Sequence, residues 1–144
     1  MKMKKLSQKQ QAEIEKLAKK KDEITPHAVV EFARNPKTEI HKCFTWDNTE
    51  AAEQYRISQA RQLLRLCITI LPGTETPTRA YVSLTQDRES PDRCYRTITS
   101  VMASEDWTEN LLADAMKDMQ RFRTKYHILK KLSGVFDAMD QVQS

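Results

Sequence analysis

Glycine occurs only twice in the 144 residues of this chain, at Gly73 and Gly134, and this scarcity limits the folds it can adopt. Proteins contain about 7% glycine on average, and glycine supplies tight left-handed turns and phosphate-binding loops. Charged residues make up 31% of the chain, which is typical of exposed helices. These two features predict a mainly helical fold and exclude the glycine-rich nucleotide-binding motifs.

Length and cysteine content indicate the kind of domain and its compartment. A chain of this size fits one domain, because domains commonly contain about 100 to 150 residues. It has no run of about 18 apolar residues and no apolar secretory signal, so we expect no membrane contact and a cytoplasmic location. Cys43, Cys67 and Cys94 form no CxxC pair and are odd in number, which predicts free thiols in a reducing compartment.

Positive charge is concentrated at one end of the chain. Residues 1–21 carry eight lysines and two glutamates, a net charge of +6, whereas residues 22–144 carry a net charge of −2. This composition is typical of a segment that neutralises phosphates without reading base sequence, although a solvated or frayed terminus has the same composition. We therefore expect a basic helical arm over residues 1–23 and a single compact domain over residues 24–144.

Three further helices are predicted by polar residues that stand just before an apolar repeat and can cap a helix. The starts lie at Thr25, at one of Asp47, Asn48 and Thr49, and at Ser104. Pro26 suits a first helical position, and Glu50 can complete a capping box from Asp47. The expected ends are at 35–36, at about Leu66 and at about Gln141, with a bend or split at Gly134.

The segment between the second and third of these helices is rich in β-branched and aromatic side chains. LCITIL at 66–71 and RAYVSLTQ at 79–86 flank a Pro/Gly/Thr loop, which predicts a hairpin, and CYRTI at 94–98 is a candidate third strand. The predicted fold is α+β and predominantly helical. It has N-terminal helices, a small antiparallel hairpin or three-stranded sheet, and a long C-terminal helix.

The helix ending near Leu66 has one polar face, which consists of Gln54, Ser58, Arg61, Gln62 and Arg65. Arginine and glutamine contact phosphates and base edges, but a solvated outer face has the same composition. Arg56 falls instead on the apolar side of this helix. We expect it to reach solvent or to pair with Glu53, one turn earlier.

The last predicted helix carries apolar residues three and four positions apart without a slip, as in a heptad repeat. The positions are Leu112, Ala115, Met119, Phe122, Tyr126, Leu129, Ser133 and Phe136. Such a stripe is expected to pack on the chain's own core or on a partner. The expected homodimer interface consists of Leu112, Met119, Phe122, Tyr126 and Leu129.

The sequence contains no constellation typical of catalysis. His27, His41 and His127 are not spaced as metal ligands, and neither a GxSxG motif nor a catalytic cysteine setting occurs. Two carboxylates that are far apart in the sequence can still act together in hydrolysis. An enzyme is therefore the third hypothesis, after nucleic-acid binding and protein binding. We predict a non-enzymatic protein with no catalytic residue, no metal site and no cofactor.

Five stretches within about residues 24–139 share one resemblance: TPHAVVEFARNP, IHKCFTWD, AEQYRISQARQLLR, TRAYVSL and CYRTITSVMASEDWTENLLADAMKDMQRFRTKYHILKKL. Together they resemble small uncharacterised proteins encoded by tailed phages and prophages. Thr124 stands where the family pattern has a basic residue, and the lysine-rich start differs from the family's N-termini. The resemblance implies a phage-related accessory protein in a bacterial host and transfers no catalytic residue.

Two classes of partner follow from these features. The first is DNA or RNA, bound without sequence specificity through the arm and the polar helix face. The residues expected to bind it are Lys2, Lys4, Lys5, Lys9, Lys16, Lys19, Lys20, Lys21, Arg61 and Arg65. The alternative is a protein-interaction module that self-assembles, or captures a host or virion protein, through the long C-terminal helix.

Overall fold

The computed structural model of the chain describes residues 5–19, 22–46, 49–89 and 93–143. The chain forms two units, Met1–Ala103 and Ser104–Ser144. Its fold is α+β and predominantly helical with a small antiparallel sheet, as the sequence predicts. The lysine-rich segment belongs to the first unit, and the chain divides after Ala103, whereas the boundary predicted from the sequence lies at residue 23.

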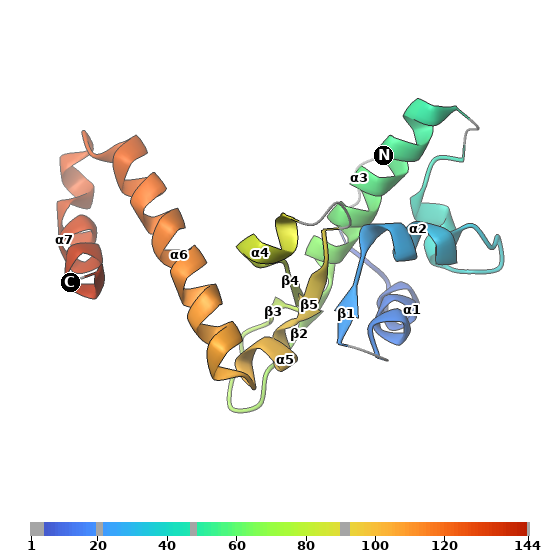
Figure 1. Ribbon diagram of the computed structural model, residues 1–144, viewed down its shortest axis with the longest axis horizontal. Coiled ribbons are helices and arrows are strands. Elements are labelled where there is room, and N and C mark those ends of the chain that lie inside the picture. The colour runs from blue at the N-terminus through green and yellow to red at the C-terminus, as the bar shows by residue number, and fades with distance from the viewer. Residues whose placement is uncertain (1–4, 20–21, 47–48, 90–92, 144) are drawn as a thin grey trace. The chain divides into compact units, whose positions relative to one another are not determined.

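Helices form most of the first unit (Figure 1). They are α1 (Gln8–Ala18), α2 (Pro26–Ala33), the 3-10 helix η1 (Ile40–Cys43), α3 (Glu50–Leu66), α4 (Thr85–Arg88) and α5 (Ile98–Met102). The predicted start of α2 is confirmed, because Thr25 Oγ1 accepts the N–H of Ala28 at 3.1 Å. Thr49 caps α3 and accepts the N–H of Ala52 at 3.2 Å, whereas the alternative caps at 47–48 lie outside the described residues.

Short strands complete the first unit. They are β1 (Glu23–Ile24), β2 (Ile68–Thr69), β3 (Thr78–Arg79), β4 (Tyr81–Val82) and β5 (Tyr95–Thr97). The predicted hairpin is confirmed, since β2 pairs antiparallel with β3 and Ile68 lies opposite Arg79. The predicted third strand is present as β5, but it pairs with β4 in a separate sheet of order β1-β5-β4.

Strand β1 has no counterpart in the sequence prediction. It contains two residues between α1 and α2, which is too short for an alternating pattern to appear. Its place is fixed by pairing with β5, where Ile24 lies opposite Tyr95, and by the N–H of Thr97, which donates to the carbonyl oxygen of Asp22 at 2.9 Å.

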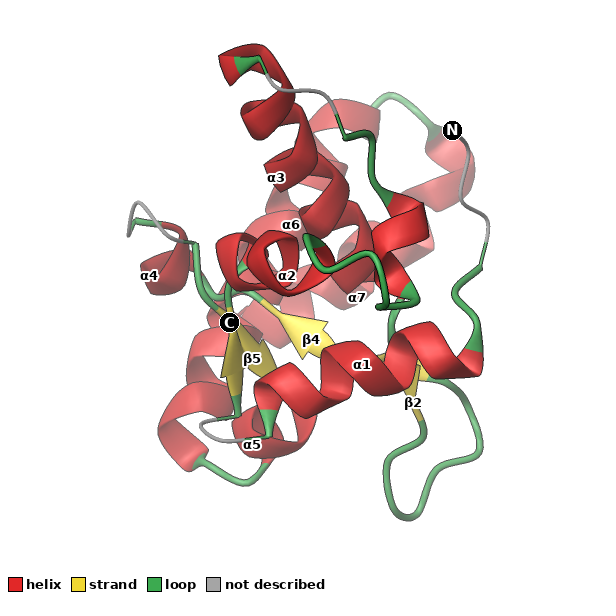
Figure 2. Ribbon diagram, turned by 90° about the vertical axis from the view of Figure 1, so that its right-hand side faces the viewer, coloured by secondary structure: helices red, strands yellow, loops and turns green. Residues whose placement is uncertain are grey.

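The core of the first unit combines side chains from α1, α2, η1 and α3 with the sheet. Its fully buried members include Ile14, Val29, Val30, Ile40, Leu63, Leu64 and Cys67. Burial of one such aliphatic side chain is worth about 1.5 to 3 kcal/mol. Helix α1 lies beside β2 (Figure 2), and Gln11 Nε2 donates to the carbonyl oxygen of Ile68. The lysine-rich helix is therefore part of the folded unit.

The second unit is a helical hairpin made of α6 (Glu105–Tyr126), the 3-10 helix η2 (Lys130–Leu132) and α7 (Ser133–Gln143). Its predicted start is confirmed, because Ser104 Oγ accepts the N–H of Trp107 at 3.3 Å. The predicted long C-terminal helix is present as α6, but the chain reverses over residues 127–132, ahead of Gly134, where a bend or split is predicted. Helix α6 ends at Tyr126, and α7 returns beside it, as Figure 1 shows.

The reversal follows from an extended residue and is stabilised by contacts between the two helices. Leu129 has φ −83° and ψ 94°, which interrupts the helix, whereas Gly134 lies in the first turn of α7. Phe136 is buried with its ring centroid 6.2 Å from that of Phe122. Arg123 Nη1 donates to the carbonyl oxygen of Phe136 at 3.4 Å. The apolar spacing continues across the turn, so it could not distinguish one helix from two.

Candidate functional site

Helix α1 has a buried inner side and a lysine-rich outer side. Ile14 and Ala18 are only 0% and 2% exposed. Lys9, Lys16 and Lys19 project from the opposite side of the helix and are exposed. We call these three residues the lysine face. Because the inner side is anchored in the core, the three ammonium groups are carried on a folded element.

Glu13 ties α1 to the rest of the first unit. Its two carboxylate oxygens accept the backbone N–H groups of Glu39 and Ile40, both at 2.9 Å. These N–H groups lie at the start of η1, where a helix has no partners of its own for them. Both carboxylate oxygens of Glu13 are therefore occupied by hydrogen bonds to η1. Glu15, the second acidic residue of α1, is exposed to solvent. The three lysines outnumber the free acid on this helix.

The residues predicted to bind nucleic acid differ in exposure. Those that are exposed are Lys5, Lys9, Lys16, Lys19 and Arg65. Those that lie outside the described residues are Lys2, Lys4, Lys20 and Lys21. Arg61 is half-buried, and its Nε has no hydrogen-bond partner within the described part of the chain. Arg65 is therefore more accessible to a phosphate than Arg61.

A hollow of about 380 Å³ lies between the start of α1 and the end of α3. Its lining consists of Lys5, Leu6, Gln8, Gln11, Ala12, Glu15, Leu66 and Ile68. Lys5 and Leu66 therefore line one surface, and Arg65 is the residue before Leu66. The fold brings the first described lysine of the arm to the end of α3 that carries Arg65.

An ion-pair network joins α2 to α3. Arg34 Nη2 donates to both carboxylate oxygens of Glu53, at 2.7 and 2.8 Å, and Arg56 Nη2 donates to the same carboxylate at 2.8 Å. Arg34 Nε also donates to Glu31 at 2.9 Å. The hydrogen bonds from Arg34 and Arg56 lower the pKa of Glu53, and those to Glu53 and Glu31 raise the pKa of Arg34. The network therefore favours the charged form of both groups.

Arg56 occupies the position that the sequence predicts, on the apolar side of α3 with Glu53 as its carboxylate partner. It is only 5% exposed, and its guanidinium lies 5.2 Å from the ring centroid of Trp46. Arg56 Nη1 donates to the carbonyl oxygen of Thr45 at 3.2 Å. Trp46 stacks on His41 at 4.7 Å and donates to the His41 carbonyl oxygen at 2.9 Å. Arg56 thus fixes the connector that precedes α3.

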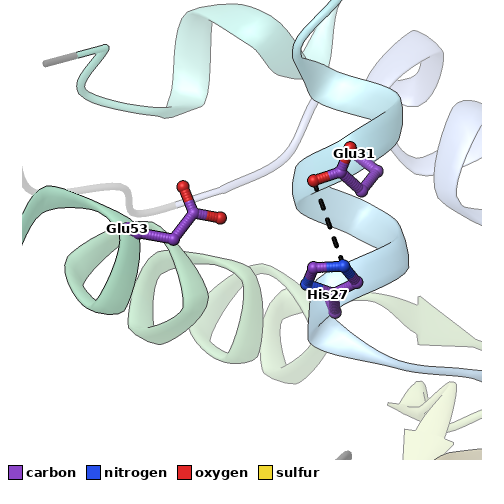
Figure 3. A group of neighbouring side chains, drawn as sticks. All are labelled: His27, Glu31 and Glu53. Atoms are coloured by element: carbon purple, nitrogen blue, oxygen red, sulfur yellow. Dashed lines mark ion pairs between the residues drawn. The ribbon is translucent and has the colours of Figure 1, made fainter. Parts of the chain in front are cut away.

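His27, Glu31 and Glu53 form a group of potential metal ligands that the sequence does not predict. Their ligand atoms lie within 4.8 Å of one another, and Glu53 points from α3 toward the other two on α2 (Figure 3). The available signal was the spacing of four residues between His27 and Glu31, whose Nε2 and Oε1 are 4.0 Å apart. Arg34 already bridges both carboxylates, so a metal ion would have to displace its guanidinium.

All three cysteines are free thiols with raised pKa values. Burial raises the pKa of Cys43, and it raises the pKa of Cys67 to about 12. The pKa of Cys94 rises to about 11 through partial burial and the nearby Glu23 carboxylate. Since the thiolate is the nucleophilic form, these groups are poor nucleophiles near neutral pH.

The residues predicted to form a dimer interface remain largely accessible in the second unit. Leu112, Phe122 and Leu129 are 55%, 40% and 46% exposed, and Met119 and Tyr126 are half-buried. Phe122 packs beside Tyr126 with a centroid distance of 5.0 Å. Leu129 lies beyond the end of α6, so the five residues do not share one continuous helix.

No protein-family model, curated protein or solved structure matches this chain. The resemblance to tailed-phage proteins therefore stays a prediction. Among the described residues, no helix is both long enough and apolar enough to cross a bilayer.

Proposed function

We propose that this protein is a non-catalytic, phage-related accessory protein of the bacterial cytoplasm that binds nucleic acid without sequence specificity. The lysine face of α1 carries the proposal, because a fixed row of exposed lysines neutralises phosphates without contacting base edges. Lys9 and Lys19 are about 15 Å apart along the helix axis. A duplex carries about nine phosphate charges over that length.

The test is fluorescence anisotropy with labelled DNA and RNA duplexes of two unrelated sequences. The combined variant Lys9→Gln, Lys16→Gln and Lys19→Gln should weaken binding at least about tenfold. It should also reduce the magnitude of the slope of log affinity against log salt by about 2 to 3. Each phosphate contact that is lost means that about one counterion fewer is released on binding. The two sequences should bind with equal affinity in the wild type.

A matched control removes the same number of positive charges from the second unit. It combines three substitutions of exposed lysines, Lys117→Gln, Lys130→Gln and Lys131→Gln. This control should keep nearly all of the affinity and the salt slope. Substitution is preferable to truncation because α1 also contributes to the core. Equal loss in the two triple variants would attribute binding to net charge alone and contradict a role for the lysine face.

The second candidate function is self-association through the second unit. Its support is that none of the described residues of α6 is buried, while Leu112 and Phe122 are 55% and 40% exposed. Soluble proteins seldom leave such apolar rows uncovered. Light scattering at micromolar concentration should give twice the 16.8 kDa chain mass. Phe122→Asp should return the mass to that of the monomer, whereas Gln120→Asp should not.

A host or virion protein is the alternative partner for the same helix. A monomeric wild type would contradict self-association and leave that alternative. Circular dichroism of Phe122→Asp checks that the variant stays folded, so that a lost dimer is not mistaken for unfolding.

A further inference from the structure

The turn between α6 and α7 exposes aliphatic side chains at one end of the helical hairpin. Residues 127–132 reverse the chain there (Figure 1). Ile128 is 74% exposed, more than any other large apolar side chain of the described residues, and Leu129 and Val135 are 46% and 47% exposed. We call Ile128, Leu129 and Val135 the apolar tip. All three side chains are accessible to a partner.

Positive charge surrounds the apolar tip. Residues 119–136 contain five arginines and lysines and no acidic residue. Residues 105–118, which form the first part of α6, contain five acidic residues and one lysine. The hairpin is therefore basic at its turn and acidic at the start of α6.

Three of the five cations at the turn are available to a partner. The two arginines already have carboxylate partners, since Arg121 pairs with Asp118 and Arg123 pairs with Asp140. The exposed cations that form no ion pair within the described part of the chain are Lys125, Lys130 and Lys131. We call these three residues the tip lysines. Two of them follow Leu129 directly in the sequence, so the tip lysines and the apolar tip form one surface.

This surface is better suited to an anionic lipid bilayer than to nucleic acid. Phosphate groups would attract the tip lysines in both cases, but the apolar tip has no aromatic ring that could stack on bases. At a bilayer interface, aliphatic side chains enter the acyl boundary while lysines stay beside the headgroups. Glu105, at the acidic end of α6, is about 30 Å from Lys125 along the helix axis. That distance keeps the acidic end away from a surface bound at the turn.

We propose that the turn between α6 and α7 is a peripheral membrane contact. The apolar tip enters the interface of a bilayer that contains anionic lipids, and the tip lysines bind the lipid headgroups. This contact is separate from the lysine face of α1. The expectation of no membrane contact rested on the lack of an apolar run that could span a bilayer, and a contact at the interface needs no such run.

The test is co-sedimentation of the full chain with vesicles of equimolar phosphatidylglycerol and phosphatidylcholine, at about 0.15 M salt, where the Debye length is about 8 Å. Wild type should bind these vesicles at least about tenfold more tightly than vesicles of phosphatidylcholine alone. The combined variant Lys125→Gln, Lys130→Gln and Lys131→Gln should lose at least about tenfold in affinity, because each lysine near an anionic surface contributes about fivefold. The lysine-face triple variant should lose less than about threefold, since it keeps the apolar tip and the tip lysines.

A second pair of variants tests the insertion of the apolar tip. Ile128→Ser should weaken binding to the phosphatidylglycerol vesicles about fivefold to tenfold, because it removes a side chain that the interface would bury. Val142→Ser is the control and should bind like wild type, because Val142 is a 60% exposed aliphatic residue near the other end of α7. Circular dichroism checks that both variants stay folded.

Each remaining outcome would contradict the membrane contact. A wild-type chain that does not bind the phosphatidylglycerol vesicles would overturn it and leave the proposed nucleic-acid binding unaffected. Equal effects of Ile128→Ser and Val142→Ser would overturn the insertion of the apolar tip. Equal losses for the tip-lysine and lysine-face variants would reduce the contact to net charge. A tip-lysine variant that loses affinity for DNA and keeps its affinity for vesicles would assign the turn to nucleic acid instead.

Discussion

At the residue scale, the two arginines that bind Glu53 differ in how far the sequence could predict them. Arg56 follows Glu53 by three positions on α3, so the helical repeat alone brings the two side chains together. Arg34 is 19 residues before Glu53 and reaches it because α2 packs on α3. No local sequence pattern indicates that contact. The sequence therefore does not predict that Arg34 belongs to the ion-pair network.

Replacing Arg56 should destabilise the first unit more than replacing Arg61. Arg56→Ala removes a nearly buried cation that contacts Glu53, the Thr45 carbonyl oxygen and Trp46. We expect a loss of about 2 to 3 kcal/mol in unfolding free energy, below the full cost for a buried pair because Glu53 keeps Arg34. Arg61→Ala should cost less than about 1 kcal/mol. Urea denaturation measures both, and equal midpoints would contradict the structural role of Arg56.

Glu53 should make stability depend on pH in the acid range. Arg34 and Arg56 lower the pKa of Glu53 in the folded chain, so its ionised form stabilises the fold above its unfolded pKa of about 4.3. That contribution is lost as the pH falls through the lower folded pKa. The thermal midpoint of wild type should exceed that of Glu53→Gln near pH 6, and the difference should shrink below about pH 4.

The exposed Glu109 supplies the control for this titration. The difference between wild type and Glu109→Gln should be small at every pH. A gap between wild type and Glu53→Gln that stays constant from about pH 3 to pH 7 would show that Glu53 stabilises the fold without its charge.

At the element scale, the sequence predicts three helix starts and the end of α3 at Leu66, but it does not predict the end of α6 at Tyr126. Thr25, Thr49 and Ser104 cap helices through hydrogen bonds to residues three positions later, and such local chemistry is visible in the sequence. The break after Tyr126 depends on contacts between α6 and α7, which the sequence does not display. Strand β1 likewise exists only through its pairing with β5.

One ion pair that joins several elements offers a test at this scale. Arg96 on β5 donates to both oxygens of the buried Asp87 on α4, at 3.0 and 2.9 Å, and to Glu23 on β1 at 2.9 Å. Asp87→Asn removes the charge of the buried carboxylate, one of the two that pair with Arg96, and should cost about 2 to 4 kcal/mol. Asp118, which forms an exposed ion pair with Arg121, supplies the control. Asp118→Asn should cost less than about 0.5 kcal/mol.

Urea denaturation of these two aspartate variants measures the difference. The comparison is informative because both residues pair with an arginine and differ mainly in burial. Similar losses for the two would mean that the contact between Asp87 and Arg96 does not hold the sheet to α4.

At the scale of the whole molecule, one helix serves both the core and the candidate contact surface. The sequence separates a basic arm from a domain because residues 1–21 are too polar to fold alone and their apolar stripe is interrupted. The structure places Leu6, Ile14 and Ala18 of this segment in the core of the first unit. Composition revealed the lysines, but the anchoring of their helix depended on distant residues of η1 and the sheet.

Removing residues 1–21 should therefore destabilise the first unit. The change exposes the site that Ile14 fills and leaves the η1 N–H groups without Glu13, so the unfolding free energy should fall by at least about 3 kcal/mol. Fluorescence of Trp46 in a Trp107→Phe background measures this, because of the two tryptophans only Trp46 lies in the first unit. The lysine-face triple variant is the control and should unfold like wild type. A truncated chain with the wild-type midpoint would show that α1 is a dispensable appendage.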